Sequence, residues 1–130
     1  MRPFNVIGEL INNSYARARA AFTERNPAAY AHLAKLQADL GVQYLTLNLD
    51  GTARIQVKME EMLAMLPDVI PAIQEATNVP LSFDNPAVAY HRVALQHYDR
   101  MVDLLRSELA AAPSRASREL ADRIRRADAV

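Results

Sequence analysis

Amide and carboxylate side chains recur directly after the short apolar runs of this sequence. The residues concerned are Glu9 and Asn12 after the first run, Asn48 near the end of the second, and Asp84 and Asn85 at the end of the third. Together, such groups satisfy a heterocycle that presents both hydrogen-bond donors and acceptors. A carboxylate can accept two N–H bonds from one amino-pyrimidine edge, a charge-assisted and bidentate contact. These five residues are therefore the candidates for a polar ligand site.

Each candidate also has a local interpretation that needs no ligand. The tripeptide Asp84-Asn85-Pro86 is typical of a helix N-cap. Asn48 can bond to loop backbone, since the following Asp50-Gly51 is a turn signal. Glu9 and Asn12, three residues apart, can form a local turn. Position in the sequence leaves capping and ligand binding both open.

The elements that must position these residues alternate between strand-sized and helical patterns. Three apolar runs, 5–8, 44–49 and 80–84, have the length and composition of strands. Between them we expect a helix that starts at Asn26-Pro27 and stops at Gly41, and a second over 57–76 that Pro67 and Pro71 kink or divide. A third helix begins near Pro86. Repeated βα units predict an α/β fold with a parallel sheet, whose ligands bind beyond the carboxyl ends of the strands.

Composition excludes several classes of function. The 130 residues carry 15 basic and 15 acidic side chains, a balance that argues against a dedicated nucleic-acid partner. The absence of cysteine excludes disulfides, thiolate metal sites and cysteine nucleophiles. No apolar run approaches the roughly 20 residues of a membrane span, and no signal peptide is recognisable, so we expect no membrane partner and a cytoplasmic location. His91 and His97 lie six residues apart, off a common helical face, so we predict no metal site.

Three segments, in order, resemble the strand motifs of the pterin-binding methyltransferases. They read IGELINN at 7–13, LTLNL at 45–49 and PLSFDN at 80–85, beside family patterns of I-G-E-R-I-N, L-D-V-N and hydrophobic-D-S. The family comprises the methyltetrahydrofolate:corrinoid protein methyltransferases and the folate domain of cobalamin-dependent methionine synthase, with dihydropteroate synthase more distant. The resemblance covers residues 4–98.

The resemblance implies a TIM (β/α)₈ barrel that holds methyltetrahydrofolate at its carboxyl mouth and passes the methyl group to the cobalt of a separate corrinoid (cobalamin) protein. Asp84 then matches the third-strand aspartate that bonds the pterin ring, with Asn85 beside it, and Asn48 matches the second-strand asparagine of the same pocket. Glu9 and Asn12 match the first-strand motif at the floor and edge of the mouth. The chain itself would bind no metal, and no catalytic residue is assigned.

The sequence departs from the family in two ways. Thr46 stands where the family usually has aspartate, and Leu10 where it often has arginine. In addition, only three strands are recognisable, whereas a barrel of this kind takes about 250 residues. We therefore expect an incomplete barrel domain over 1–112, whose open sheet is covered by the tail, by a homodimer or by a complementing chain. The alternative functions are a non-catalytic interaction or assembly module on a truncated barrel scaffold, and a pterin-binding protein without turnover.

The final segment, 113–130, reads as an arginine-rich helical tail. Its arginines alternate with acidic residues, a pattern typical of a salt-bridged exposed face. Contact with an acidic partner or with the glutamate tail of the folate is the other interpretation. The methionines at 59, 62 and 65 are predicted to fill the core.

Overall fold

The structure is a computed structural model that describes residues 4–50, 57–85, 88–109, 112–113 and 115–127. It divides into two compact units, Met1–Pro86 and Ala87–Val130. The division falls before the third predicted helix, whereas the domain boundary predicted from the sequence follows it.

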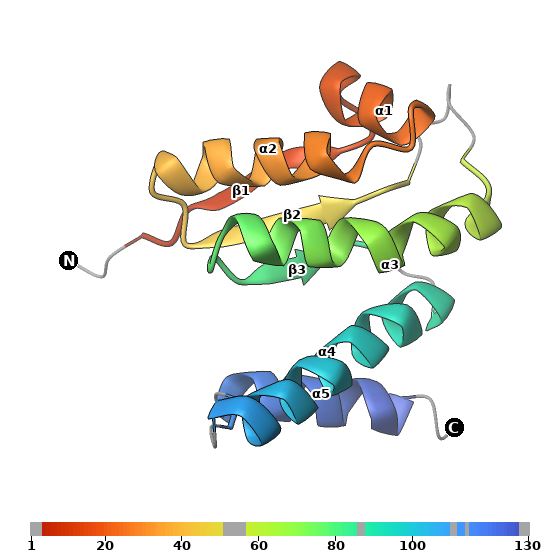
Figure 1. Ribbon diagram of the computed structural model, residues 1–130. Helices are drawn as coiled ribbons and strands as arrows, with labels where there is room; N and C mark the ends of the chain where they lie inside the picture. Colours follow the sequence, from red (N-terminus) through yellow and green to blue (C-terminus); the bar gives the residue numbers. More distant parts are fainter. Residues whose placement is uncertain (1–3, 51–56, 86–87, 110–111, 114, 128–130) are drawn as a thin grey trace. The chain divides into compact units, whose positions relative to one another are not determined.

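The first unit contains a parallel three-stranded sheet with helices along one face. In chain order its elements are β1 (Ile7–Asn12), α1 (Ala16–Thr23), α2 (Pro27–Asp39), β2 (Tyr44–Asn48), α3 (Met59–Ala76) and β3 (Leu81–Phe83). The strands pair in the order β1-β2-β3, and both pairings are parallel. Helices α2 and α3 pack against each other over the sheet (Figure 1). The predicted α/β class with parallel βα units is therefore confirmed, while the relation to a TIM barrel stays a prediction.

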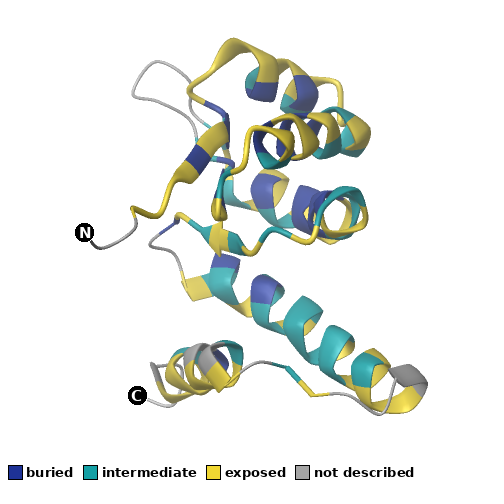
Figure 2. Ribbon diagram, turned by 90° about the vertical axis from the view of Figure 1, so that its left-hand side faces the viewer, coloured by how far each residue is buried: buried dark blue, intermediate teal, exposed yellow. Residues whose placement is uncertain are grey.

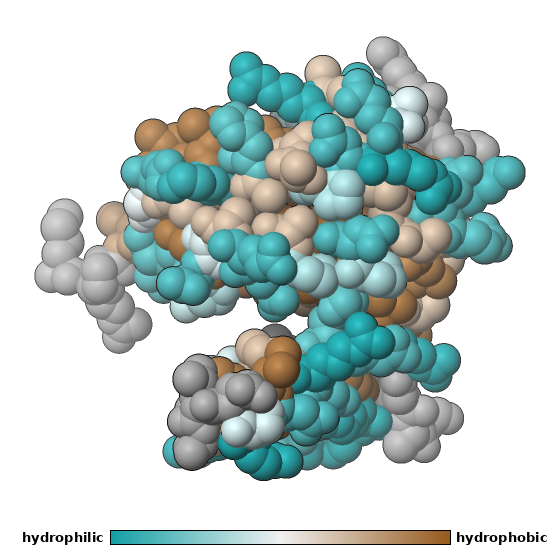
Figure 3. Space-filling model, viewed as in Figure 1, coloured by the Kyte–Doolittle hydropathy of each residue, from teal (hydrophilic) through white to brown (hydrophobic). Residues whose placement is uncertain are grey.

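The core lies between the sheet and these helices, as Figure 2 shows. Strand β2 contributes Leu45 and Leu47, both fully buried, and Leu49 directly follows it; the intervening Thr46 and Asn48 are only half-buried. This alternation sends the leucines toward the helices and Thr46 and Asn48 toward the other face, because successive side chains of a strand point to opposite sides. The buried face of α3 consists of Met62, Met65, Leu66, Val69, Ile70 and Ile73. On the outer surface of the helices, hydrophilic and hydrophobic side chains are interspersed (Figure 3).

The helix signals of the sequence are confirmed at α2 and partly wrong at α3. Asn26 caps α2 by accepting the backbone N–H of Ala29 at 3.1 Å, and Gly41 follows the helix with a φ of 84°. By contrast, α3 is one helix of 18 residues that runs through Pro67 and Pro71, so of the two predicted outcomes, a kink or a division into shorter pieces, the division is wrong. The apolar face of α3 is buried over its whole length, and that packing outweighs the backbone bonds lost at the two prolines.

The first strand is longer than its sequence pattern predicts. The expected strand was 5–8, but β1 spans Ile7–Asn12. Its register with β2 shifts between Gly8 and Ile11, so that Glu9 and Leu10 together lie opposite Thr46. One extra residue on one strand of a pair is a β-bulge, which lets the strand continue past the interruption. Glu9 and Asn12 therefore lie within the strand and not after it, which corrects the expectation for both.

The second unit is a pair of helices, α4 (Val88–Leu109) and α5 (Arg115–Ala127), which contact each other. Arg125 of α5 forms an ion pair with Asp99 of α4, and it bonds Asp122 at 3.1 Å. Arg115 pairs with Glu119 at 2.6 Å along the same helix. The arginine-rich tail is thus helical with exposed ion pairs, as the salt-bridged interpretation predicts.

Candidate functional site

Three of the predicted site residues form a row across the carboxyl ends of the strands. Asn12 of β1 pairs in register with Asn48 of β2. Asp84 directly follows β3, and its N–H donates to the carbonyl of Leu47 at 3.0 Å, which continues the β2–β3 register by one residue. Asn12, Asn48 and Asp84 therefore occupy neighbouring positions on three adjacent strands. This row is called the carboxyl row below.

Within the carboxyl row, the side chain of Asn48 is held at both ends. Its Nδ2 donates to Oδ2 of Asp84 at 3.0 Å, and its Oδ1 accepts the N–H of Asp50 at 2.9 Å. The second bond fixes which end of the amide faces Asp84, because only the Nδ2 end can donate. Asp84 is exposed, and its Oδ1 has no hydrogen-bond partner among the residues that the structure describes. The row thus presents an oriented and accessible carboxylate.

Asn12 within the row and Asn85 next to it both use their side chains in hydrogen bonds to the protein itself. Asn85 is buried, and its Nδ2 donates to Oδ2 of Asp50 at 2.8 Å, which ties the end of β3 to the segment after β2. Asn12 accepts the N–H of Ser14 through its Oδ1 at 2.8 Å, whereas the local turn between Glu9 and Asn12 that the sequence allowed is absent, because both residues lie in β1. Asn12 and Asn85 therefore shape the edge of the sheet, and Asp84 is the more accessible ligand group.

Glu9 lies further back along its strand than the row. Because of the bulge in β1, Glu9 is opposite Thr46, two residues before Asn48 on β2. From the sequence, Glu9, Asn48 and Asp84 are expected together at the carboxyl ends of the strands. Asn48 and Asp84 do lie together there, but Glu9 does not. A strand of ordinary register that ended at Gly8 would have placed Glu9 at the rim.

A buried pair that the sequence did not assign to the site anchors this edge. Asn13 accepts the hydroxyl of Tyr30 at 2.8 Å through its Oδ1 and donates from Nδ2 to the carbonyl of Leu49 at 2.8 Å. Its N–H donates to the carbonyl of Asn48 at 3.0 Å. Burial raises the pKa of Tyr30 far above its ordinary value, although the bond to Asn13 opposes part of that shift. The Asn13–Tyr30 pair thus fixes the ends of β1 and β2 to α2.

The described residues contain neither a cluster of metal-ligating side chains nor a membrane-spanning helix. In the part of the chain that the structure describes, no three histidine or carboxylate side chains gather closely enough to hold a metal ion. Over the same residues, every helix is too short or too polar to cross a membrane.

The fold and the row define an α/β protein with a polar group at the carboxyl ends of parallel strands. No protein-family model matches the chain, and no curated protein matches it.

Proposed function

We propose that the chain binds the pterin ring of a methylated tetrahydrofolate at the carboxyl row, with Asp84 accepting N–H bonds from the amino-pyrimidine edge. The observation that supports this proposal is the bond from Asn48 Nδ2 to Asp84 Oδ2 at 3.0 Å, with Asn48 itself fixed by the N–H of Asp50. Parallel sheets bind ligands at this edge, where loops converge and side chains from adjacent strands meet.

The chemistry of the carboxylate suits that ligand. An ionised carboxylate offers about four lone-pair positions, and Asn48 occupies one of them. The remaining positions can accept two parallel N–H bonds, and hydrogen bonds to charged groups contribute about 1.5–3 kcal/mol each. Two residues before Asn48 and Asp84, Thr46 pairs in register with Ser82. Their hydroxyl groups extend the polar surface from the carboxyl row toward the amino ends of the strands.

The proposal extends to transfer of the methyl group to a separate corrinoid protein. N5 of the folate is a poor leaving group until it gains positive character, so the protein's contribution is to orient the pterin and to favour that charge. The corrinoid, carried by the partner, supplies the nucleophile that accepts the methyl group. On this proposal the role of Asn48 and Asp84 is to bind and orient the ring.

A second candidate function is a non-catalytic assembly module, and the sheet edges favour it. Within the described residues, β1 and β3 each pair only with β2, so each presents one edge without a strand partner. Unpaired edges are templates for strand addition. A homodimer or a complementing chain would then cover them. If this is the function, light scattering detects a stable complex and substitution at Asp84 leaves it intact.

Calorimetric titration with methyltetrahydrofolate tests the pterin proposal. Asp84→Asn keeps the shape of the side chain and an acceptor for Asn48 but removes the charge, and we expect it to weaken binding roughly 10- to 100-fold, which corresponds to about 1.4–2.8 kcal/mol. The matched control is Asp68→Asn, which makes the same charge change on an exposed position of α3. Circular dichroism verifies that each variant folds.

Two results would contradict pterin binding: no heat with the unaltered chain, or equal affinity for the unaltered chain and Asp84→Asn. If binding is found, the visible spectrum of a reduced corrinoid protein, mixed with the chain and methyltetrahydrofolate, reports methyl transfer. An unchanged spectrum would mean that the chain binds the pterin but does not catalyse methyl transfer.

A further inference from the structure

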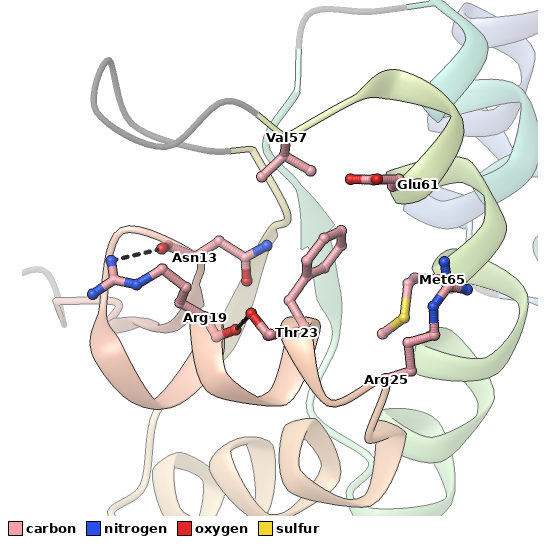
Figure 4. Close-up of a pocket in the computed structure, with 8 residues that line it drawn as sticks. Asn13, Arg19, Thr23, Arg25, Val57, Glu61 and Met65 are labelled. Atoms are coloured by element: carbon pink, nitrogen blue, oxygen red, sulfur yellow. Dashed lines mark hydrogen bonds between the residues drawn. The ribbon is translucent and has the colours of Figure 1, made fainter.

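A cavity of about 320 Å³ lies beside α1 and the amino end of α3. Apolar side chains and opposite charges both line it, among them Arg19, Phe22, Arg25, Val57, Glu61 and Met65 (Figure 4). Its volume is at the lower end of the range for small-molecule pockets, about 300–1,000 Å³. No residue of the carboxyl row lines the cavity, although Asn13, which anchors the neighbouring edge of the sheet, does.

Arg25 enters this cavity from a backbone conformation that arginine rarely adopts. Its φ is 49°, in the left-handed region. Arg25 ends α1 in a Schellman motif. Its N–H donates to the carbonyl of Phe22 at 3.1 Å, and the N–H of Asn26 donates to the carbonyl of Ala21 at 2.9 Å. Glycine is the residue favoured at this position, because a Cβ crowds the backbone there. The chain therefore carries a strained arginine where glycine would be more stable, and such strain is a recognised mark of functional positions.

The opposite charges of the cavity do not form an ion pair with each other. Arg25 and Glu61 are both exposed and both line the cavity, and neither side chain has a hydrogen-bond or ion-pair partner among the described residues. Figure 4 shows the side chains of Arg25, from the end of α1, and of Glu61 and Met65, from successive turns of α3, around the cavity. Arg19 differs, because its guanidinium donates to the carbonyl of Ser14 at 3.3 Å. One cation and one anion are thus left for a ligand.

We propose that this cavity binds a free α-amino acid with an apolar or aromatic side chain. The carboxylate of the ligand pairs with the guanidinium of Arg25, whose fork of N–H groups matches carboxylate geometry. The ammonium group pairs with Glu61, and the side chain packs against Phe22, Val57 and Met65. A simple anion would bind less well, because Glu61 repels it, and a simple cation would be repelled by Arg25.

Titration with L-phenylalanine, followed by the amide proton–nitrogen correlation spectrum, tests the proposal. We expect saturable shifts at cavity residues, and weaker binding of phenylacetate, which lacks the ammonium group. Arg25→Gly should weaken L-phenylalanine binding at least about 10-fold while the melting temperature rises by roughly 2–5 °C, since the strain is relieved. Arg25→Asn, which also tolerates the left-handed conformation, should lose affinity equally. Glu61→Gln should weaken L-phenylalanine and remove its advantage over phenylacetate.

The matched control is Arg17→Ala, which removes an exposed positive charge of α1 outside this cavity. It should leave L-phenylalanine binding unchanged. Absence of saturable shifts in the unaltered chain would overturn the proposal. So would full affinity in Arg25→Gly or Arg25→Asn, or a loss in Arg17→Ala as large as the loss in Arg25→Gly.

Discussion

Replacing Gly8 by alanine should destabilise the first unit through a single buried side chain, that of Gln37. A Cβ at position 8 would lie 2.4 Å from Oε1 and 2.9 Å from Cδ of Gln37. Gln37 is buried, and it ties α2 to the bulge of β1. Its Oε1 accepts the N–H of Leu10 at 2.9 Å, and its Nε2 donates to the carbonyl of Leu33 at 3.1 Å. The added methyl group therefore displaces the side chain that satisfies the bulged strand.

The expected magnitude follows from these contacts. Forcing an extra methyl group into a packed site costs about 1–3 kcal/mol. The N–H of Leu10, which is only partly buried, loses its acceptor, and this adds at most about 1–3 kcal/mol. Some relaxation of Gln37 offsets part of both, so we expect Gly8→Ala to lower the free energy of unfolding by about 2–4 kcal/mol. Backbone strain does not contribute, because the only glycine with a positive φ among the described residues is Gly41.

A double-mutant cycle in urea, followed by far-ultraviolet circular dichroism, isolates this effect. The chains compared are the unaltered one, Gly8→Ala, Gln37→Ala and the double variant. Once Gln37 is shortened, the methyl group at position 8 has room, so the double variant should be no less stable than Gln37→Ala alone. The coupling energy should then equal the full cost of Gly8→Ala, about 2–4 kcal/mol. The reasoning is refuted if Gly8→Ala lies within about 0.5 kcal/mol of the unaltered chain, or if the two effects simply add.

Further predictions concern the buried pair, a helix cap and the exposed ion pairs. Tyr30→Phe should cost about 1–2 kcal/mol in a thermal melt at neutral pH, because it leaves Oδ1 of the buried Asn13 without its donor. Burial raises the pKa of Tyr30, so as the pH rises the unfolded chain loses the hydroxyl proton before the folded chain does. The free energy of unfolding should therefore be constant below about pH 10 and fall above it, by up to about 1.4 kcal/mol per pH unit. Tyr30→Phe should lack this pH dependence. Asn26→Ala should cost about 1 kcal/mol by urea unfolding, because it removes the cap of α2, whereas Asn26→Asp should be nearly neutral; equal losses would argue against capping. Arg125→Ala should change the thermal stability of the second unit by less than about 1 kcal/mol, since both its ion pairs are exposed to solvent, and a larger loss would mean that α4 and α5 depend on them.

The order of elements, apart from the short helix α1, and most of the carboxyl row could be predicted because both depend on local patterns. Apolar runs of strand length separated by helical periodicity predict parallel βα units, and the residues after such runs then lie at one edge. Asn48 and Asp84 meet there, as expected.

What the sequence did not predict depends on contacts between distant residues. The bulge at Glu9 and Leu10 is stabilised by Gln37, 27 residues from Leu10 in the sequence. Tyr30 reads as one more apolar position of a helix, and only the folded chain shows its hydroxyl bonded to Asn13. Because proline disrupts helices, the sequence predicts a kink or a division at Pro67 and Pro71. Burial of the apolar face instead keeps α3 a single helix. A glycine at position 25 would have predicted a left-handed helix end, but an arginine does not. The left-handed conformation of Arg25 is therefore visible only in the structure.

The side-chain amide of Asn48 offers the most direct test of pterin binding at the carboxyl row, because it already donates to Asp84. Its two N–H resonances can be followed in a proton–nitrogen correlation spectrum as methyltetrahydrofolate is added. They should shift saturably, together with the backbone N–H of Asp84, while the side-chain amide of Asn26 at the α2 cap stays in place. Unmoved Asn48 resonances in a folded chain at high ligand concentration would contradict pterin binding at this edge.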